Sequence, residues 1–511
     1  MRFVILSLLS GLLLAISIPC ISAPVAGEIA STTLTLTVTN SILMALENNR
    51  ALAVERYGPD ILESFVTEEE ASFDPSLQAQ WSSSETHGQR TSGVGEFTTV
   101  ESIQRTTTVD INKRTTRGWD VGLEASAGSR SSNVYRRMFS TRLGVSLNVP
   151  LMEAAGKEVN LVGVRQAQQD TEISRQELRG FVLELAAQVE ENYWDLVLAR
   201  EELNIHLTSL DLARQQMEET QARIEVGDLP EIDIAAAEGE VALRDEDVID
   251  AESTIQKTTL LLLRSLNPPM ENLWSLPIDL VDTPNREEPI LGDIQEQIRI
   301  ALENRPDLNQ AHLELERNEL EIVRTRNGLL PKLDFFITLG RTGYARTFDD
   351  SVRGLEDPNF ELLGGFLFEH PLGNRADHAR HRRADLRVEE SKAALQNLEQ
   401  LIELDVRTAY VEVERTGRQI QATQTATRLQ EAKHTAEVEK FRVGKSTNLL
   451  VLVAQRDLIQ SNLDEVRARI QQRKALVDLY RSEGILLDRR DIVIPSDTTP
   501  VIPTQSISDP R

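Results

Sequence analysis

Residues 444–446 read Gly-Lys-Ser and resemble the end of a phosphate-binding loop. Such a loop presents backbone N–H groups and a lysine to phosphate oxygens, and it needs another glycine five residues before Gly444 and a strand ahead of it. Glu439 stands at that position, and the residues before it have the periodicity of a helix. Gly227, the related position in an internal repeat, also follows a helical pattern. Both glycines are therefore predicted to end one helix and begin a turn to the next.

Two histidines, His378 and His381, are spaced three residues apart and could hold a metal from one face of a helix. They lie in an arginine-rich run just after Pro371, where contact with lipid headgroups or acidic neighbours is the alternative. The 81 Asp and Glu residues single out no carboxylate pair, and the sequence has no Gly-x-Ser-x-Gly motif. The sequence therefore predicts no catalytic site, no cofactor and no metal site.

The formal net charge of −26 argues against a nucleic-acid partner, because phosphate binding needs a basic surface. Charged residues make up 27% of the chain and aromatic residues only 5%, which suits long exposed helices better than a bulky globular core. After the N-terminal segment, no stretch reaches the roughly 20 apolar residues of a transmembrane helix. Any part that spans a membrane would therefore be built from strands.

The N-terminal segment has the pattern of a secretory signal. Residues 3–18 are mostly apolar and lead into small residues, which predicts a signal peptide over residues 1–23 with a cleavage position that stays open between 22 and 27. Cys20 is the only cysteine, which excludes an intrachain disulfide. It either leaves with the signal or becomes a lipid-modified N-terminus, and Pro19 before it fits that modification poorly.

Two halves of the sequence carry the same markers in the same order. The motif Ala-Leu-Glu-Asn occurs at residues 45–48 and again at 301–304, and each half then has two alternating segments bounded by prolines. The boundary prolines are Pro75, Pro150, Pro331 and Pro371. One structural unit is therefore predicted to occur twice. The predicted parts are a first repeat over 28–267, a linker over 268–289, a second repeat over 290–487 and a disordered tail over 488–511.

Apolar and polar residues alternate beside these prolines, as in Leu143, Val145 and Leu147 before Pro150. Alternation with period two predicts strands with one wet and one apolar face, and segments of about ten residues suit strands that cross a membrane. Four strands cannot close a barrel, so they either form a sheet within the chain or share a barrel with other chains. Residues 83–139 are polar and are predicted to be an enlarged loop, with room for a hairpin at 107–112 and 118–126.

Apolar residues recur at a spacing of seven after Pro150. A strict seven-residue repeat predicts a left-handed coiled coil, and a helix over residues 157–226 would be about 100 Å long. Such a rod must pack against other rods. The first helix carries Val182, Val189, Leu196, Leu203, Leu210, Met217 and Ile224, and the next carries Ile234, Val241, Val248, Ile255 and Leu262.

This order of elements and prolines resembles the TolC-like outer-membrane efflux protein family over about residues 34–487. The resemblance implies a fold that is mainly α with a transmembrane β part. Three chains would form a trimeric α-barrel of long antiparallel coiled coils, topped by a shared β-barrel with four strands per chain. It also implies a passive exit duct in the outer membrane of a Gram-negative-type cell, held in outer-membrane lipid and extending into the periplasm. The implied partners are a periplasmic adaptor protein and an inner-membrane pump.

In the family resembled, the two helix turns lie at the periplasmic tip, where the tunnel closes and the adaptor docks. Some members carry two Asp residues after the second turn, and Leu450 and Val453 stand at those positions, which suggests an apolar constriction that closes by dewetting. Glu231 and Asp233 in the first half are either an acidic counterpart or ordinary first-turn acids favoured by the helix dipole. The tip candidates are Gly227, Asp228, Glu231, Asp233, Gly444, Lys445, Leu450 and Val453.

Two other classes of protein compete with the channel. One is a secreted coiled-coil scaffold or a periplasmic adaptor without a pore, and the four alternating segments argue against it because a soluble rod has no use for them. The other is a periplasmic enzyme on a helical scaffold, for which the sequence offers no catalytic constellation.

Overall fold

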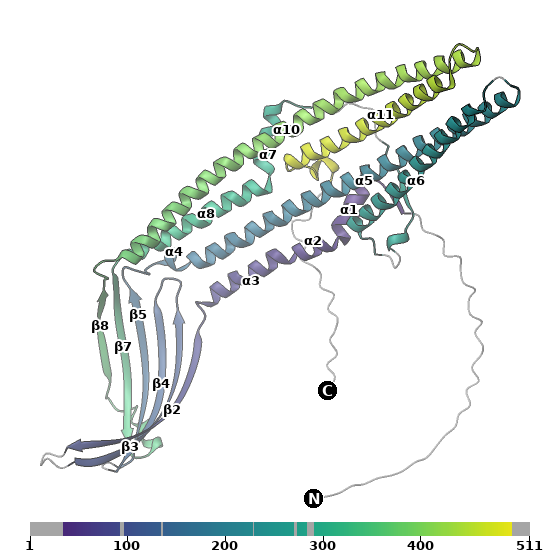
Figure 1. Ribbon diagram of the computed structural model, residues 1–511. Helices are drawn as coiled ribbons and strands as arrows, with labels where there is room; N and C mark the ends of the chain where they lie inside the picture. The colour runs from purple at the N-terminus through teal and green to yellow at the C-terminus, as the bar shows by residue number, and fades with distance from the viewer. Residues whose placement is uncertain are drawn as a thin grey trace, which may run out of the picture.

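The computed structural model describes residues 34–91, 97–133, 136–227, 229–269, 273–283 and 291–492. Long helices run side by side over most of the molecule, and one sheet extends from one end of them (Figure 1). Among the described helices, none combines the length and the apolar character needed to cross a bilayer. The predicted signal over 1–23, Cys20 and Asp228 lie outside the described residues.

A single antiparallel sheet contains six strands in the order β2-β3-β4-β5-β7-β8. Strands that follow one another in the sequence are paired, and the helices are inserted between β5 and β7. The strands are β2 (Ser76–Thr91), β3 (Phe97–Arg114), β4 (Asp120–Ser132), β5 (Met138–Pro150), β7 (Lys332–Ala345) and β8 (Glu361–Glu369). The four boundary prolines stand at the helical end of the sheet as predicted, since Pro75 and Pro331 precede strands, Pro150 ends one and Pro371 follows one.

The prediction of four strands per chain was wrong, because β3 and β4 add two more. They lie within residues 83–139, where the sequence indicated a loop with room for a hairpin. The hairpin is present and extends well beyond the segments 107–112 and 118–126. The alternation in β3 is weak because Arg105 and Thr107 share a face with Ile103, Val109 and Ile111, so the pattern did not stand out from that of a polar loop.

Two long helical hairpins form the body of the molecule. They are α5 (Val162–Glu225) with α6 (Ile232–Leu266), and α10 (Arg375–Arg442) with α11 (Asn448–Ser482). A short helix, α4 (Lys157–Asn160), precedes α5. The 64 residues of α5 span about 100 Å, as the sequence predicts.

The seven-residue repeat forms the contact between the helices of each hairpin. Val189 and Leu196 of α5 and Leu262 of α6 are fully buried. In the second half the repeat is less regular: it includes Val406, Val413, Ile420 and Phe441 of α10 and is interrupted by Thr427 and His434. Thr427 Oγ1 donates a hydrogen bond to the Ser461 carbonyl oxygen of α11 at 3.1 Å. The predicted coiled-coil packing is confirmed.

Shorter helices lie against the half of the long helices that is nearer the sheet (Figure 1). They are α1 (Val38–Asn48), α2 (Arg50–Glu55), α3 (Tyr57–Ala71), α7 (Ile294–Asn304) and α8 (Pro306–Asn327). The first helix begins after Thr37, whose Oγ1 accepts a hydrogen bond from the Asn40 N–H at 3.2 Å. Asn49 then ends α1 and caps α2 with its side-chain oxygen.

The predicted linker over 268–289 and the predicted disordered tail over 488–511 both include residues that are part of the folded structure. Strand β6 (Ile278–Leu280) lies inside the predicted linker and pairs in parallel with β1 (Leu34–Leu36), and η1 (Leu273–Ser275) precedes it. The predicted tail begins with η2 (Asp488–Arg490), and Ile492 is buried in the same apolar cluster as Val189. The described parts of both segments, which include Ile278 and Ile492, therefore belong to the core around α5, while residues 493–511 lie outside the described chain.

Candidate functional site

The two turns that join the long helices lie at the end of the molecule opposite the sheet (Figure 1). Gly227 and Gly444 have φ values of +83° and +70°, a backbone conformation that residues with a Cβ rarely adopt. Both glycines therefore end a helix, as predicted. Lys445 is exposed in the second turn, and its N–H bonds to the Lys440 carbonyl oxygen at 2.8 Å. The preceding element is α10, not the strand that a phosphate-binding loop requires.

Close to these tips, α5 is joined to the second hairpin by two contacts. The guanidinium carbon of Arg223 lies 4.5 Å from the centre of the Phe441 ring, which is a cation–π geometry. Gln216 Nε2 donates a hydrogen bond to Asn448 Oδ1 at 3.2 Å. Phe441 and Asn448 are both buried. The sequence marked Phe441 as a member of the seven-residue repeat, but it gave no sign of its partner 218 positions earlier in the chain.

The turn at Gly444 is tied to its own hairpin through Glu437. The Lys440 ammonium group and the Ser446 hydroxyl both donate hydrogen bonds to its carboxylate, with the Ser446 bond at 2.8 Å. These two bonds, the Lys440 bond first, hold the pKa of Glu437 below its usual range. The carboxylate therefore stays ionised and keeps the turn closed around it.

The remaining tip candidates fall on both hairpins. Glu231 directly precedes α6 and makes no capping bond, and Asp233 is half-buried in the first turn of that helix. In the first turns of α11, Leu450 is 50% exposed and Val453 is half-buried. These four side chains make no hydrogen bond or ring contact between the two hairpins among the described residues. The contacts that join the hairpins near the tips are those of Arg223 and Gln216.

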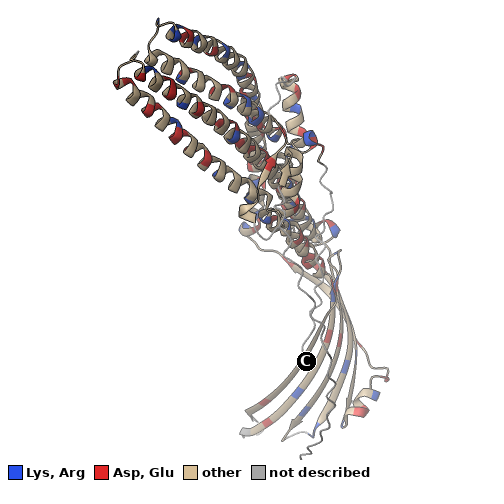
Figure 2. Ribbon diagram, turned by 90° about the vertical axis from the view of Figure 1, so that its right-hand side faces the viewer, with Lys and Arg blue, Asp and Glu red and all other residues tan. Residues whose placement is uncertain are grey.

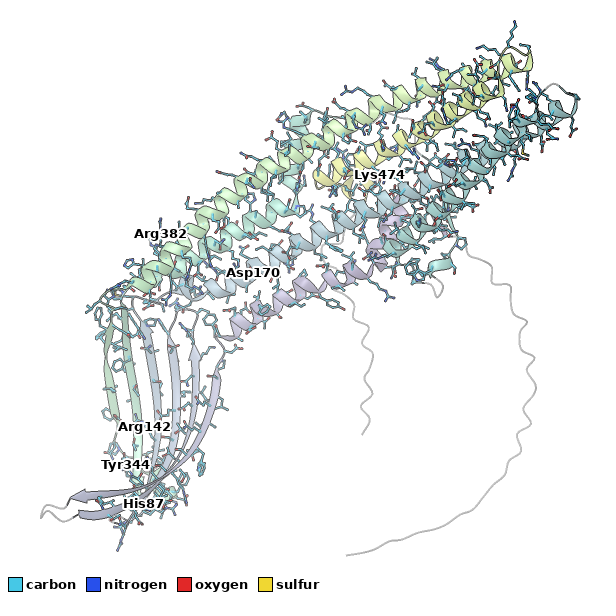
Figure 3. The ribbon with its side chains drawn as sticks, in the orientation of Figure 1. His87, Arg142, Asp170, Tyr344, Arg382 and Lys474 are labelled. Carbon is cyan, nitrogen blue, oxygen red and sulfur yellow. The ribbon has the colours of Figure 1, made fainter. Side chains whose placement is uncertain are left out.

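A row of ion pairs joins α5 to α11 nearer the middle of the molecule. Lys474 Nζ lies 2.6 Å from Asp195 Oδ1, and Arg467 Nε lies 2.7 Å from Glu202 Oε1. The two acids are seven residues apart on α5, and the two basic residues are seven apart on α11. The ion pairs therefore recur at a regular interval along the antiparallel helices. Figure 3 labels Lys474, which lies between the two hairpins. This row was not predicted from the sequence, although the basic residues at a spacing of seven on α11 were a signal of it.

One face of the sheet is apolar and exposed. Residues paired across an antiparallel sheet share a face, so the register identifies rows that run over all six strands. One row is entirely apolar, and its members are 43–70% exposed: Leu77, Ile111, Leu123, Val145, Leu339 and Leu362. A sheet that packed this face on a protein core would bury these side chains. The face suits contact with lipid instead.

The opposite face is polar. The neighbouring row reads Gln78, Asp110, Glu124, Gly144, Gly340 and Glu361. Arg142 projects from β5 on this face and forms an ion pair with Glu361 of β8. Figure 3 labels Arg142 within the sheet, and Figure 2 shows that charges are sparse on the strands compared with the long helices. The sheet therefore separates a wet side from an apolar side.

The histidine pair near the start of α10 does not form a metal site with acidic neighbours. His381 Nδ1 lies 3.2 Å from Thr325 Oγ1 of α8, which joins the two helices, and His378 is exposed. Within the described residues, no group of three or more His, Cys, Asp and Glu side chains converges as metal ligands would.

The family model described as outer membrane efflux protein matches residues 42–267 and 297–484. The chain belongs to the outer membrane efflux protein family. The resemblance seen in the sequence is confirmed. The two matched segments correspond to the two halves that carry the repeated markers, and together they cover most of the chain.

The chain is also similar to individual proteins of known role. The pyoverdine export outer membrane protein OpmQ of Pseudomonas putida is 25% identical over 363 residues, which cover 68% of this chain and 72% of that protein. The OpmQ protein of Pseudomonas aeruginosa is 24% identical over 348 residues, covering 65% and 69%.

Solved structures share the fold. The outer-membrane channel OprN superposes with a TM-score of 0.66 at 16% identity, over 88% of this chain and 89% of that one. The CmeC outer membrane channel of Campylobacter jejuni gives 0.65 at 15% identity, over 88% and 86%.

Membership of this family makes the chain an outer-membrane efflux channel. The protein lies in the outer membrane and extends into the periplasm. The family is one of efflux ducts and not a class of enzyme.

Proposed function

We propose that three copies of this outer-membrane efflux channel assemble around one axis and share a single β-barrel and a single α-helical tunnel. The observation that carries the proposal is the open sheet. Its apolar face is exposed on all six strands, and its edge strands β2 and β8 each pair on one side only. An unpaired strand edge cannot face hydrocarbon, because every backbone N–H and C=O group in lipid needs a partner.

The helices support the same assembly. An exposed apolar stripe runs along α10, with Leu404 and Val411 seven residues apart and 58% and 57% exposed. A protein whose surface helices carry such a stripe buries it against another helix. The neighbouring protomer supplies that helix in the trimer.

We also propose that residues 28–267 and 290–487 are tandem repeats, each with helices, paired strands and a long helical hairpin. Matching tyrosines support this. Tyr193 of α5 donates a hydrogen bond to the Leu36 carbonyl oxygen at 3.1 Å, and Tyr410 of α10 donates one to the Gly292 carbonyl oxygen at 3.3 Å. Each tyrosine anchors the segment at the start of its own half. In the buried site of Tyr193, loss of solvent raises its pKa to about 12, so it remains a donor.

The duct performs no chemistry in this proposal. An inner-membrane pump supplies the energy, and a periplasmic adaptor protein docks at the helical tips near Gly227 and Gly444. The tips are the narrow end of the tunnel, with Leu450 and Val453 as an apolar constriction and with Glu231 and Asp233 as acids beside it. An apolar ring at the narrow end of a water-filled tunnel would gate it there by dewetting.

The native mass of the protein tests the assembly. The protein is extracted from separated outer and inner membranes, and its mass is corrected for bound detergent. Three protomer masses in the outer-membrane fraction are expected. A monomer or dimer, or a protein absent from the outer membrane, would contradict the shared barrel.

A further inference from the structure

The extra hairpin β3–β4 lies in the middle of the sheet, not at its rim. It is hydrogen-bonded to β2 on one side and to β5 on the other. Ile111 of β3 pairs with Leu77 of β2, and Leu123 of β4 pairs with Val145 of β5, so the apolar row crosses the hairpin without interruption. The strands of a long external loop would not need to keep this register.

In the part of the hairpin nearer the helices, from Val109 to Ala125, its two faces also match those of the neighbouring strands. Val109 and Leu123 are exposed on the apolar face, at 37% and 49%. Asp110 and Glu124 pair with each other on the polar face. An aqueous loop has no use for an exposed apolar face that continues the faces of β5 and β7, whereas a membrane wall requires it.

We propose that the β3–β4 hairpin is part of the membrane wall, so that each protomer contributes six strands and the trimer closes a barrel of 18 strands, three times six, instead of 12. This inference rests on the proposed trimer. The occupant of each open edge is a second copy of this chain: β8 of one protomer pairs with β2 of the next. Six strands cannot close on themselves, because a barrel needs about eight even to fill its interior with side chains.

The consequence is a wider outer section. Barrel diameter grows roughly linearly with strand number, so 18 strands enclose a lumen about 1.5 times as wide as 12, in the range where barrels hold an aqueous channel. The polar face lines that lumen with Asp110, Glu124 and the Arg142–Glu361 ion pair. The wall in the outer membrane would therefore pass bulky hydrophilic cargo, and selection by size would take place at the helical tips.

Single cysteines test the placement of the hairpin, because residues 21–511 contain none. The variants are Leu123→Cys on the apolar face of β4 and Ser126→Cys on its polar face. Val145→Cys and Ser146→Cys on β5 are the matched controls. Each purified variant is labelled with bimane and placed in vesicles of phosphatidylcholine with brominated acyl chains, which quench a fluorophore in contact with lipid.

Quenching at 123 and 145, but not at 126 and 146, is the expected result. Quenching at 145 without quenching at 123 would place the hairpin outside the lipid, which overturns the inference and leaves the proposed channel intact. Quenching at neither 123 nor 145 would overturn both. A density map of the trimer in a lipid nanodisc gives the strand number directly, and 12 strands instead of 18 would overturn the inference alone.

Charge substitution is a second and independent test. Leu123→Arg places a cation in the apolar face and should reduce the trimer recovered from outer membranes about tenfold or more, as Arg does in the lipid face of other barrels. Ser126→Arg, three residues along the same strand but on the polar face, should leave recovery near that of the unmodified protein. Equal recovery of the two variants would contradict the wall placement.

Discussion

Arg490 Nε lies 2.9 Å from Glu190 Oε2, and this contact joins the end of the described chain to the middle of α5, 300 positions earlier. The Glu190 side chain has no solvent exposure, and its other oxygen accepts a hydrogen bond from Trp194 Nε1 at 3.3 Å. A buried carboxylate of this kind depends on its cation. Residues 483–492 are thus a structural part of the helical body, not a loose tail.

Arg490→Ala should therefore destabilise the protein strongly, by about 3 kcal/mol, because it leaves the Glu190 carboxylate buried without a charge partner. The midpoint of urea unfolding, followed by far-UV circular dichroism, measures this. Glu190→Gln combined with Arg490→Ala removes the buried charge and should recover part of the loss. Arg456→Ala, an exposed arginine of α11, is the control and should change the midpoint little. Equal effects of Arg490→Ala and Arg456→Ala would mean that the buried pair contributes nothing.

Glu483 makes the stability of the helical body depend on pH. Its side chain has no exposure at the end of α11, and burial raises its pKa to about 7, against the opposing charge of Arg489. Between about pH 4.5 and 7, the folded state therefore keeps a proton that the unfolded state has lost. The free energy of unfolding should fall as pH rises through this window. Glu483→Gln should abolish the fall and raise the thermal midpoint at pH 8, with little change at pH 5.

The side-chain amide of Gln297 in α7 lies against the Glu483 carboxyl group. The neutral amide in Glu483→Gln can make the same hydrogen-bonded contact, so the variant changes charge with little change in shape. A lower thermal midpoint for Glu483→Gln than for the unmodified protein at pH 8 would show that the ionised carboxylate is stabilising, and would contradict the argument.

The helical body could be predicted from the sequence because its signals are local and periodic. Val189 and Leu196 recur at the spacing of a coiled coil and are fully buried, and Pro75 and Pro331 stand directly before strands. The number of strands was predicted wrongly because a membrane strand needs only one apolar face, and in β3 that face is interrupted by Arg105 and Thr107. The pairing of β3 with β2 and β4 identifies it as a strand, which the weak alternation of its residues does not.

The contacts between distant segments could not be predicted for a different reason. Arg490 with Glu190, and Arg223 with Phe441, join residues that no spacing relates, and among so many charged residues no pair stands out. The two glycines of the tips were found because a helix that ends in a sharp turn requires a residue with positive φ. Which side chains join the tips to each other follows only from the packing of four long helices.

The ion pair between Lys474 and Asp195 should couple α5 to α11 modestly. The two side chains are 29% and 40% exposed, so a contribution of about 0.5–1 kcal/mol is expected, screened by salt. Exchanging the charges with Lys474→Asp and Asp195→Lys should restore most of the stability that either single change removes. The coupling energy from this double-mutant cycle is the measurement, and a value near zero at low salt would contradict the prediction.

His434 should make the second hairpin less stable in acid. It occupies the seven-residue stripe of α10 beside a cavity of about 230 Å³ that Ser209 and Gln455 help to line, and burial lowers its pKa. The unfolded state then binds a proton more readily than the folded state, so this contribution is fully present above about pH 6.5 and is lost as pH falls. His434→Leu should raise the thermal midpoint more at pH 5.5 than at pH 7.5, whereas the exposed His378→Gln should not. The same rise at both pH values would exclude protonation of His434 as the cause.

The contacts of Arg223 with Phe441 and of Gln216 with Asn448 should hold the tips together. A cation–π contact and a buried hydrogen bond contribute about 1 kcal/mol each, so Arg223→Ala with Gln216→Ala should favour separation of the hairpins by about 2 kcal/mol, or roughly 30-fold. Single-channel recordings in planar bilayers should then show a larger conductance or a higher open fraction. Gln215→Ala is the matched control, because Gln215 is exposed and bonds only to Asp211 of its own helix among the contacts described.

Leu450→Asp with Val453→Asp should also raise conductance by wetting the constriction, but without loosening the hairpins. A disulfide between α5 and α10 near the tips should suppress the first effect and not the second, because only the first requires the helices to move apart.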